Sequence, residues 1–303
     1  MFEFFKIQLL SFENSEDIFD LHKGIPIHRI CNMQRHGCIN PRIIEADPFL
    51  FVHHDRLFLF YEQKDLKTPG VLMMTSTADL ENWTKPVCVL EEDYHLSFPW
   101  VFEHERAIYM LPESGASKSI RLYKAVDDSL TKFEYCATLL EEPKGRTVTM
   151  SYGDTCIHVK DGVYCLFTQL QYDDRINTLE LYTSDSLDGP YMVHPMSPIQ
   201  HNQKLGRNAG SLFMKDDVLY RFSQDCTSFY GDNVHVTEID ELTTSAFREH
   251  LVKENLLPAD IEFYADGGHQ FNVVHFLDKW IVATDAKEYH PLWCIRIRNK
   301  LGI

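Results

Sequence analysis

Positive charge is scarce in this sequence and is nowhere clustered. The chain of 303 residues has 29 Lys and Arg against 45 Asp and Glu, which gives a formal net charge of −16 at pH 7. Because phosphate backbones are bound by clustered Lys and Arg, this composition argues against nucleic acid and anionic membranes as unassisted partners. No run approaches the roughly 18 consecutive apolar residues that a membrane span needs. The apolar N-terminus also lacks the small-residue cleavage site of a signal peptide. We therefore expect a cytoplasmic protein without a membrane span.

Paired cysteines are lacking as well. None of the eight cysteines forms a C-x-x-C pair or stands at a metal-type spacing from histidine. They are Cys31, Cys38, Cys88, Cys136, Cys156, Cys165, Cys226 and Cys294. Disulfide frameworks are typical of much smaller secreted domains, and several of these cysteines lie in apolar runs, where free cysteine packs as a small hydrophobe. We therefore expect the protein to occupy a reducing compartment. Cys226 has no base at a fixed spacing, so we do not expect it to act as a nucleophile.

A repeated hairpin pattern is what the sequence does contain. Residues 45–62 form two short apolar runs joined by a polar turn at 53–56, with an acid before the first run and another after the second. Four further stretches repeat this pattern: 99–113, 155–169, 210–224 and 269–285. The period of about 50 to 60 residues is the size of one four-stranded propeller blade. The sequence therefore predicts an all-β, five-bladed β-propeller.

The repeat makes the whole chain, residues 1–303, a single domain, and 44% hydrophobic residues are ample for its core. The predicted blades are 43–93, 96–142, 150–203, 206–257 and 264–300. Since an open ring leaves an unpaired strand edge, we expect the N-terminal extension, 1–42, to close the ring on blade five, with a short helical cap as the alternative. Residues 243–257 fit either a short helix or an outer strand with a loop.

The candidate site follows from the architecture. The first strand of each blade lines the central channel, so residues at the start of these strands converge on one mouth. These residues are Asp47, Phe98, Asp154, Asn208, Asp266 and His269. The ends of the second strands add Glu62, Glu113, Gln169, Gln224 and Asp225, with Arg221 just inside, and Arg207 enters on the loop before blade four. Core packing alone does not require so many polar groups in one place.

Structural interpretations of the same residues stay open. Asp47 precedes a proline and could cap a turn, and Glu62 could be a solvated acid at a blade edge. Arg221 lies between two aromatic residues and needs an acidic partner, for which Asp225 is a candidate. His269 could be a ligand of a structural cation such as calcium on the channel axis, although we predict no catalytic metal or cofactor. The adjacent His53 and His54 belong to a turn and are expected at the surface.

Several motifs carry a family resemblance. Residues 46–51 (ADPFLF), 75–83 (TSTADLENW) and 97–114 resemble the five-bladed propeller of the arabinanase, invertase and levansucrase superfamily of glycoside hydrolases. Residues 208–213 (NAGSLF), 219–226 (LYRFSQDC) and 266–272 (DGGHQFN) resemble most the N-terminal domain of glucosamine inositolphosphorylceramide transferases and its bacterial relatives. The resemblance covers residues 40–290 and is more specific for the fold than for an activity.

The resemblance implies roles for three acids. Hydrolases of this superfamily use an acid at the start of blade one as general base, one at the start of blade three to orient and tune its partner, and a Glu as general acid. Asp47 and Asp154 match the first two positions. Blade four starts with Arg207 and Asn208 and has no Glu, so Glu113 is the nearest candidate for the acid. An inverting glycosidase needs its two carboxyls about 6.5 to 9.5 Å apart.

The sequence is compatible with three functions. The leading one is a carbohydrate-active enzyme that makes, breaks or transfers a glycosidic bond. Its substrate would be a sugar or a sugar phosphate, because Arg207, Arg221 and His269 could together hold a phosphate or carboxylate; phosphorolysis and transfer then stand beside hydrolysis. The second is a non-catalytic sugar-binding module that serves a glycosyltransferase partner. The third, a protein scaffold, predicts a blank mouth, against which the acids and arginines argue.

Overall fold

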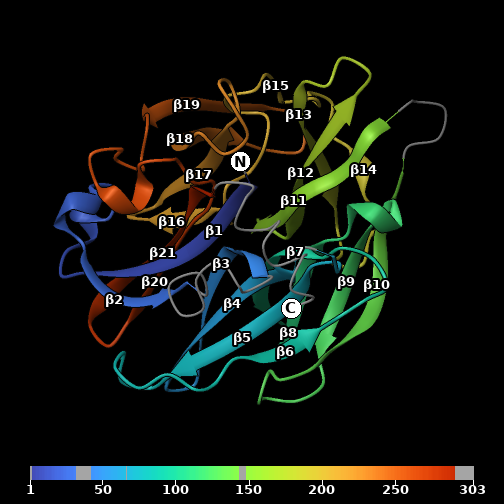
Figure 1. Cartoon of the computed structure of the whole chain (residues 1–303). Helices are drawn as coiled ribbons and strands as arrows, with labels where there is room; N and C mark the ends of the chain where they lie inside the picture. The colour runs from blue at the N-terminus through green and yellow to red at the C-terminus, as the bar shows by residue number, and fades with distance from the viewer. Residues whose placement is uncertain (1, 32–41, 66, 143–147, 291–303) are drawn as a thin grey trace.

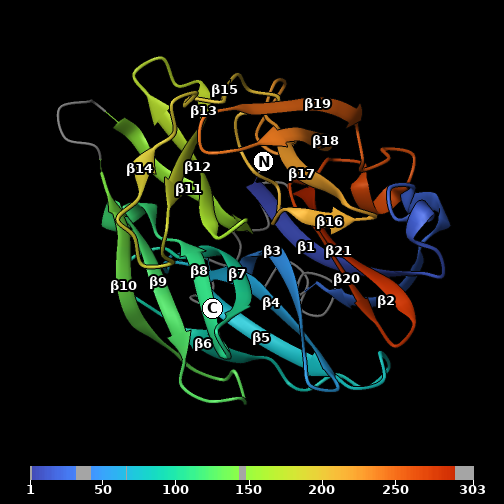
Figure 2. The ribbon, with the colours of Figure 1, turned by 180° about the vertical axis from the view of Figure 1, so that it is seen from behind.

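The computed structural model describes residues 2–31, 42–65, 67–142 and 148–290. Cys38, Cys294 and the predicted end of blade five beyond residue 290 lie outside these ranges. Five antiparallel sheets are arranged around a common centre (Figures 1 and 2). This confirms the predicted single-domain five-bladed β-propeller.

Blades one to three are formed by consecutive strands, with the inner strand first. Blade one consists of β3 (Arg42–His53), β4 (Arg56–Asp65), β5 (Val71–Thr77) and β6 (Val87–Leu90). Blade two consists of β7 (Ser97–His104), β8 (Ala107–Glu113), β9 (Ser119–Ala125) and β10 (Phe133–Glu141). Blade three consists of β11 (Val148–Lys160), β12 (Val163–Tyr172) and β13 (Asn177–Ser184), with β14 (Met192–Val193) and β15 (Gln200–His201) both paired to β13.

The last two blades differ in how they are built. Blade four consists of β16 (Phe213–Lys215), β17 (Val218–Asp225), β18 (Asn233–Leu242) and β19 (Phe247–Lys253). The undecided segment 243–257 thus contains an outer strand and not a helix. Blade five combines both ends of the chain: β20 (Phe271–Phe276), β21 (Lys279–His290), β1 (Phe2–Phe12) and β2 (Ile25–Ile30).

The ring is closed by the N-terminal segment, as predicted. Strand β1 pairs with β21 along its full length, from Phe2 opposite His290 to Phe12 opposite Trp280. In Figure 1 the blue N-terminal strands lie beside the red C-terminal ones. This pairing satisfies the backbone groups that an open last blade would leave exposed. The only helical turns described here between β1 and β2 are two short 3-10 turns, Ser15–Asp17 and Leu21–Lys23.

The core lies between the faces of neighbouring sheets. Where blade one meets blade two, Phe49 and Phe98 pack edge to face with their ring centroids 4.6 Å apart, and both are almost fully buried. Aromatic pairs of this geometry contribute about 0.5 to 1.5 kcal/mol beyond the area they bury. The alternation of apolar residues that predicted the strands therefore also supplies the contacts between the blades.

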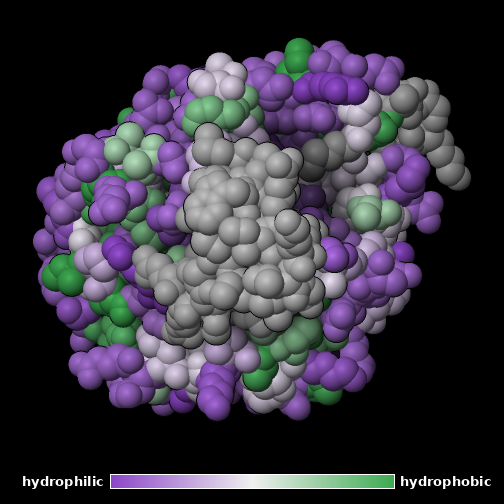
Figure 3. Space-filling model, in the orientation of Figure 1, coloured by the Kyte–Doolittle hydropathy of each residue, from purple (hydrophilic) through white to green (hydrophobic). Residues whose placement is uncertain are grey.

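The surface fits the composition. Around the rim of the face shown in Figure 3, hydrophilic residues predominate and hydrophobic ones are scattered. The six cysteines in the described ranges, which exclude Cys38 and Cys294, are free thiols. Within the same ranges, no helix has the length and apolar character that a bilayer crossing requires.

Candidate active site

Local distortions within three inner strands build the mouth of the channel. Asp47, Phe98 and Asp154 have φ values of 51°, 48° and 47°. At each of these positions the pairing of the inner strand with its neighbour shifts register. Bulges of this kind change the direction in which side chains point. A left-handed backbone conformation costs a non-glycine residue free energy, and residues in such conformations cluster at functional sites. Three blades thus repeat one distortion at equivalent positions.

A cavity of about 270 Å³ lies at this mouth. Blades one, two, four and five all contribute to its wall. It is lined by Phe5, Ile44, Ala46, Asp47, Glu62, Lys64, His95, Ser97, Glu113, Arg207, Tyr230 and His269. Five of the residues predicted from the sequence are therefore brought together: Asp47, Glu62, Glu113, Arg207 and His269. Residues separated by more than 200 positions in the chain share one polar pocket.

Asp285 anchors one side of the cavity. Its carboxylate accepts hydrogen bonds from the backbone N–H groups of His269 (2.8 Å), Gln270 (3.1 Å) and Asp47 (3.2 Å). It also lies 2.5 Å from Nδ1 of His269. Burial alone would raise the pKa of Asp285, but His269 and these hydrogen bonds bring it below its ordinary value. Asp285 is thus a fixed negative charge that holds the backbone of Asp47 in place.

Arg207 joins two acids on the other side. Its Nε donates to Oδ2 of Asp154, and its Nη2 lies 3.2 Å from Oε2 of Glu113. Asp154 is further held by the side-chain amide of Gln224, 2.7 Å from Oδ2, and its backbone N–H lies 3.3 Å from Glu113. The guanidinium also lies over the ring of Tyr230 at 5.4 Å. One cation is therefore shared between two buried carboxyls, which favours retention of a proton by the pair.

Asp47 and Glu113 have pKa values that are raised to different extents. Burial, aided by Asp154 and Asp285 and opposed by His269, raises the pKa of Asp47 to about 6. Burial and the charge of Asp154, opposed by Arg207, raise the pKa of Glu113 to about 8. Near pH 7 Asp47 is then mostly ionised while Glu113 is mostly protonated. Environments that separate two carboxyl pKa values in this way define a base and an acid.

Glu62 is the third carboxyl in the cavity. Burial and the charge of Asp47 raise its pKa well above the ordinary value. Nδ1 of His95 accepts a hydrogen bond from the backbone N–H of Gly70 at 3.0 Å, and burial lowers the pKa of His95 to about 4. A neutral His95 in this tautomer presents Nε2–H to Oε1 of Glu62, 3.5 Å away. The environment of Glu62 therefore favours its neutral form, and its side chain lines the cavity.

Other predicted site residues support the mouth without lining it. Asn208 is fully buried and donates to the backbone oxygen of Asp154 at 2.8 Å, and Gln224 holds the same residue through its carboxylate. The ring of Phe98 lies in the core between blades, while its backbone N–H donates to Oδ2 of Asp47 at 3.0 Å. Asp266 is half-buried and lines none of the cavities described here.

Two expectations about arginine and aspartate need correction. Arg221 pairs with Glu249 and not with Asp225: Nε and Nη2 of Arg221 donate to the two carboxylate oxygens at 2.8 and 2.6 Å. Asp225 instead lies 2.9 Å from Nε2 of His235. Arg221 is fully buried, so it cannot contact a substrate in the cavity. The partner was missed because Glu249 lies on β19, in the segment whose structure the sequence left undecided.

Sequence reasoning also missed residues that the structure places at the site. Asp285 lies on β21, the second strand of blade five, at the position equivalent to Glu62 and Glu113 in the repeat, so the alignment could have identified it. Tyr230 lies on the loop after β17 and packs edge-on against His269 at 5.2 Å. Phe5 comes from the N-terminal strand and stacks on His269 at 4.7 Å. No repeat signal points to these two.

Asp47, His269 and Asp285 each offer one ligand atom within 4.8 Å of the others, so they could hold a metal ion. Two carboxylates and one imidazole suit a divalent cation in type. Burial lowers the pKa of His269, but Asp285 and Asp47 raise it above its ordinary value. A cation at this place would therefore compete with the proton that His269 holds toward Asp285. The cation on the channel axis stays a prediction.

A second cavity begins at Glu113. It has a volume of about 440 Å³ and lies between blades two and three. Its lining is mostly polar: Glu113, Gly115, Ala116, Lys118, Glu142, Val148, Thr149 and Ser151. Glu113 therefore lines both this cavity and the one at the mouth.

Comparison with known proteins identifies sequence relatives. Residues 26–285 match the family model described as glucosamine inositolphosphorylceramide transferase 1, N-terminal. The chain is 35% identical over 216 residues to glucosamine inositolphosphorylceramide transferase 1 of Oryza sativa subsp. japonica, covering 69% of this chain and 28% of the rice protein. The Arabidopsis thaliana protein of the same name is 32% identical over 237 residues, covering 76% and 29%. The chain thus spans less than a third of these relatives.

Solved structures with a similar fold are glycoside hydrolases. A family 117 glycoside hydrolase from the marine bacterium Zobellia galactanivorans aligns with a TM-score of 0.57 at 14% identity, covering 94% of this chain and 90% of that one. A family 43 protein from Bacillus licheniformis aligns with a TM-score of 0.51 at 17% identity, covering 69% and 43%. At these identities the similarity concerns the fold alone.

Proposed function

The chain belongs to the family of glucosamine inositolphosphorylceramide transferase N-terminal domains, and we propose that it is a carbohydrate-active enzyme that makes, breaks or transfers a glycosidic bond. The relatives are named as glucosamine inositolphosphorylceramide transferases, a name that combines a sugar and a lipid, and a structural neighbour is named as a glycoside hydrolase. We interpret both names as pointing to enzymes that form, cleave or transfer glycosidic bonds. We assign the reaction to the cavity at the mouth of the channel.

The observation that carries this proposal is the pair of carboxyls with separated pKa values in one cavity. Asp47, with a pKa of about 6, is ionised at neutral pH and acts as general base. Glu113, with a pKa of about 8, keeps its proton and acts as general acid. Glycosidic bond cleavage with inversion requires this combination. Asp154 orients and tunes Glu113 through Arg207, the role expected from the resemblance.

In this mechanism the sugar ring whose bond is broken occupies the 270 Å³ cavity. Glu113 donates its proton to the glycosidic oxygen as the bond to the anomeric carbon breaks. Asp47 removes a proton from the hydroxyl that attacks the opposite face of that carbon. The leaving sugar or lipid headgroup then lies in the 440 Å³ cavity beyond Glu113. Glu62, which lines the cavity, hydrogen bonds a sugar hydroxyl.

The charge distribution favours water or a sugar hydroxyl over phosphate as the attacking group. Arg221 is buried against Glu249, and Arg207 is engaged by Asp154 and Glu113. The phosphate site that the sequence suggested for Arg207, Arg221 and His269 therefore lacks two free cations. Asp47, which lines the same cavity and is ionised at neutral pH, also repels a second negative charge. We assign the substrate to uncharged or cationic sugars accordingly.

Turnover by active-site variants tests the proposal. A panel of aryl glycosides and oligosaccharides is screened first with the wild-type chain. Asp47→Asn and Glu113→Gln should each lower kcat by about 10² to 10⁴, and Glu113→Gln should spare aryl glycosides whose leaving groups need no proton. Glu238→Gln, on the outer part of blade four, is the control acid-to-amide change. Full activity in Asp47→Asn would eliminate that residue as the base.

A non-catalytic sugar-binding module is the second candidate function. It is favoured by Arg207, which stands at the start of blade four, where the hydrolases of the resembling superfamily carry their acid. Such a module would present sugars to a glycosyltransferase partner. It predicts that sugars bind at the mouth but are not turned over, and that Asp47→Asn weakens binding and changes no rate.

A further inference from the structure

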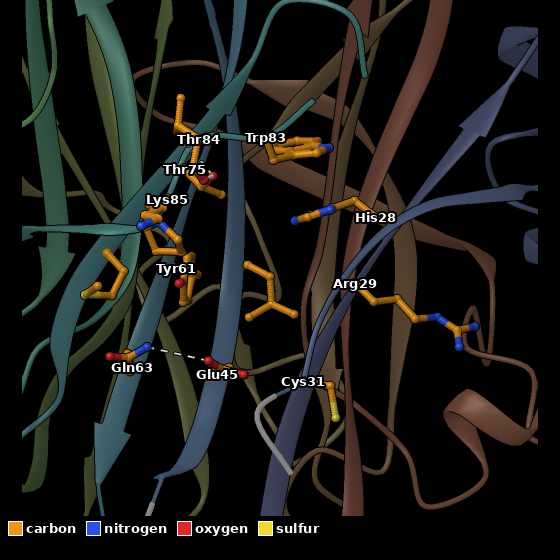
Figure 4. A pocket seen from close by; sticks show the side chains of 13 residues that line it. His28, Arg29, Cys31, Glu45, Tyr61, Gln63, Thr75, Trp83, Thr84 and Lys85 are labelled. Carbon is orange, nitrogen blue, oxygen red and sulfur yellow. Dashed lines mark hydrogen bonds between the residues drawn. The ribbon is translucent and has the colours of Figure 1, made fainter. Parts of the chain in front are cut away.

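The largest of the described cavities lies away from the mouth, between blade five and blade one. It has a volume of about 490 Å³ and is bounded by β2 on one side and by β3, β4, β5 and the loop after β5 on the other. Figure 4 shows this space with the side chains that line it. We call it the interblade cavity. Nothing in the mechanism above uses it.

Strand alternation places this cavity back to back with the proposed active site. Along β4, Glu62 and Lys64 face the mouth, while Tyr61 and Gln63 face the interblade cavity. Along β3, Ala46 faces the mouth and Glu45 faces the other side. Successive residues of a strand point to opposite faces of the sheet, so the two cavities share β3 and β4 as a common wall. The polar residues on the interblade side are therefore not part of the site already described.

The floor of the interblade cavity is polar although it is buried. Glu45 and Gln63 are 3% and 8% exposed. Nε2 of Gln63 lies 3.5 Å from Oε1 of Glu45, and the pair is drawn with a dashed line at the bottom of Figure 4. Thr75 and Thr84 add hydroxyl groups higher up the wall. Buried carboxylate and amide groups next to a cavity can bind the hydroxyl groups of a ligand.

The upper wall is aromatic. Trp83 and His28 stack with ring centroids 4.2 Å apart and planes inclined by 14°, and Tyr61 lines the same space. The indole Nε1 of Trp83 is buried and has no hydrogen-bond partner among the residues that the structure describes. An unpaired buried donor costs about 1 to 3 kcal/mol, which an incoming acceptor would recover.

The one arginine on the wall is turned away. Arg29 donates from Nε to Oε1 of Gln8 at 2.6 Å, and its guanidinium lies 5.2 Å from the ring centroid of Phe263. Figure 4 shows the side chain of Arg29 pointing out of the space that Glu45 and Tyr61 face. The interior is thus lined by an acid, an amide, hydroxyl groups and one lysine, Lys85.

We propose that the interblade cavity is a second binding site, for a sugar ring. Aromatic rings, a carboxylate and amide and hydroxyl groups around one space suit the apolar faces and the equatorial hydroxyls of such a ligand. The volume lies within the about 300 to 1,000 Å³ of ordinary ligand sites and would hold one or two sugar rings. This site does not depend on the proposed reaction at the mouth.

Saccharide binding to the whole chain tests the proposal. D-glucose, D-galactose, maltose, cellobiose and lactose are titrated separately, with binding followed by isothermal calorimetry and by tryptophan fluorescence. At least one saccharide should bind the wild-type chain and perturb the fluorescence of Trp83. Trp83→Ala should weaken that binding by about tenfold or more, and Glu45→Gln and Gln63→Leu by smaller factors. Trp83→Phe, which keeps the stack on His28 but removes the N–H, should lie between wild type and Trp83→Ala.

Controls separate this site from the mouth. Asp47→Asn and Glu113→Gln should bind the same saccharide at the interblade cavity with unchanged affinity, and far-ultraviolet circular dichroism should show that each variant is folded. Binding that survives Trp83→Ala and Gln63→Leu but disappears in Asp47→Asn would belong to the mouth and would overturn the inference. Absence of any saccharide binding to the wild-type chain outside the mouth would overturn it as well.

Discussion

Two buried arginines on blade four, Arg207 and Arg221, differ in how their charge is balanced. Arg221 is fully buried and meets a single acid, Glu249, through two parallel hydrogen bonds. Thr237 also donates to Glu249, at 2.8 Å, and the net effect of these partners is to lower the pKa of Glu249 in spite of its burial. Arg207 lies beside a cavity and is shared by two acids, Asp154 and Glu113, of which Glu113 has a pKa raised to about 8.

Burial alone does not distinguish a balanced ion pair from one that retains a proton. Around Arg221 the charges are matched one to one, and no proton is left to exchange. Around Arg207 there is one carboxyl more than the cation can balance, so a proton is held at the edge of a cavity, where a substrate could receive it. Both arginines lie on or near one blade, and both are buried. The number of partners, and not the depth of burial, separates the structural pair from the functional one.

The largest effect is expected from breaking the balanced pair. Glu249→Gln leaves Arg221 buried without a counter-charge, and arginine cannot release its proton at any accessible pH. The free energy of unfolding should fall by about 3 to 5 kcal/mol, measured by urea denaturation, and by nearly the same amount at pH 5 and pH 8. Glu238→Gln, on the same sheet but only partly buried, should cost less than about 0.5 kcal/mol. A loss below about 1 kcal/mol for Glu249→Gln would contradict the structural role.

Removing the shared arginine should give a smaller loss that depends on pH. Arg207→Gln leaves Asp154 and Glu113 without a cation, but carboxyls can take up protons, so the loss at pH 5 should be modest. It should grow toward pH 8, because removing the cation raises the proton affinity of Glu113 further, and folding must then take up a proton that the unfolded chain has released. Denaturation at both pH values, run beside Glu249→Gln, measures the contrast. Equal losses at pH 5 and pH 8 would show that Arg207 is balanced in the same way as Arg221.

The smallest expected effect is the pH dependence of the wild-type melting temperature. Between pH 4.5, the ordinary pKa of a glutamic acid, and about 8, the folded chain holds a proton on Glu113 that the unfolded chain has released. Stability must then fall as the pH rises through this window. Replacing Glu113 with Gln removes this contribution, so the decline between pH 5 and pH 8 should be shallower by a few °C. A steeper or unchanged decline would mean that Glu113 is ionised in the folded state.

The fold could be predicted because the repeat encodes it. Five similar hairpins at a constant period specify a ring of blades, and the need to cover the last edge specifies closure by the N-terminus, which β1 and β2 provide. The convergence of Asp47, Glu62, Glu113, Arg207 and His269 followed from strand position alone. What failed were pairings set by tertiary packing: the partner of Arg221 lies on β19, an outer strand with no clear pattern, and Tyr230 and Phe5 reach the mouth from a loop and from the far end of the chain.

The cavities could not be predicted for a related reason. Alternation along β3 and β4 was visible in the sequence, but the space that each face looks into depends on how neighbouring blades tilt. Glu45 and Gln63 are therefore polar residues of a strand in the sequence and the floor of a cavity in the structure. The sequence indicates which polar groups lie on each face of β3 and β4. Only the packed ring shows how far each face lies from the opposite wall of its cavity.

Direct titration of the mouth carboxyls tests the central claim. In a chain labelled with ¹³C at the carboxyl groups of Asp and Glu, the resonances missing from Asp47→Asn and Glu113→Gln assign the two acids in the wild type. The resonance of Glu113 should titrate near pH 8 and that of Asp47 near pH 6, so that one is protonated and the other ionised at neutral pH. Titration of both groups below pH 5 would contradict the assignment of an acid and a base to this cavity.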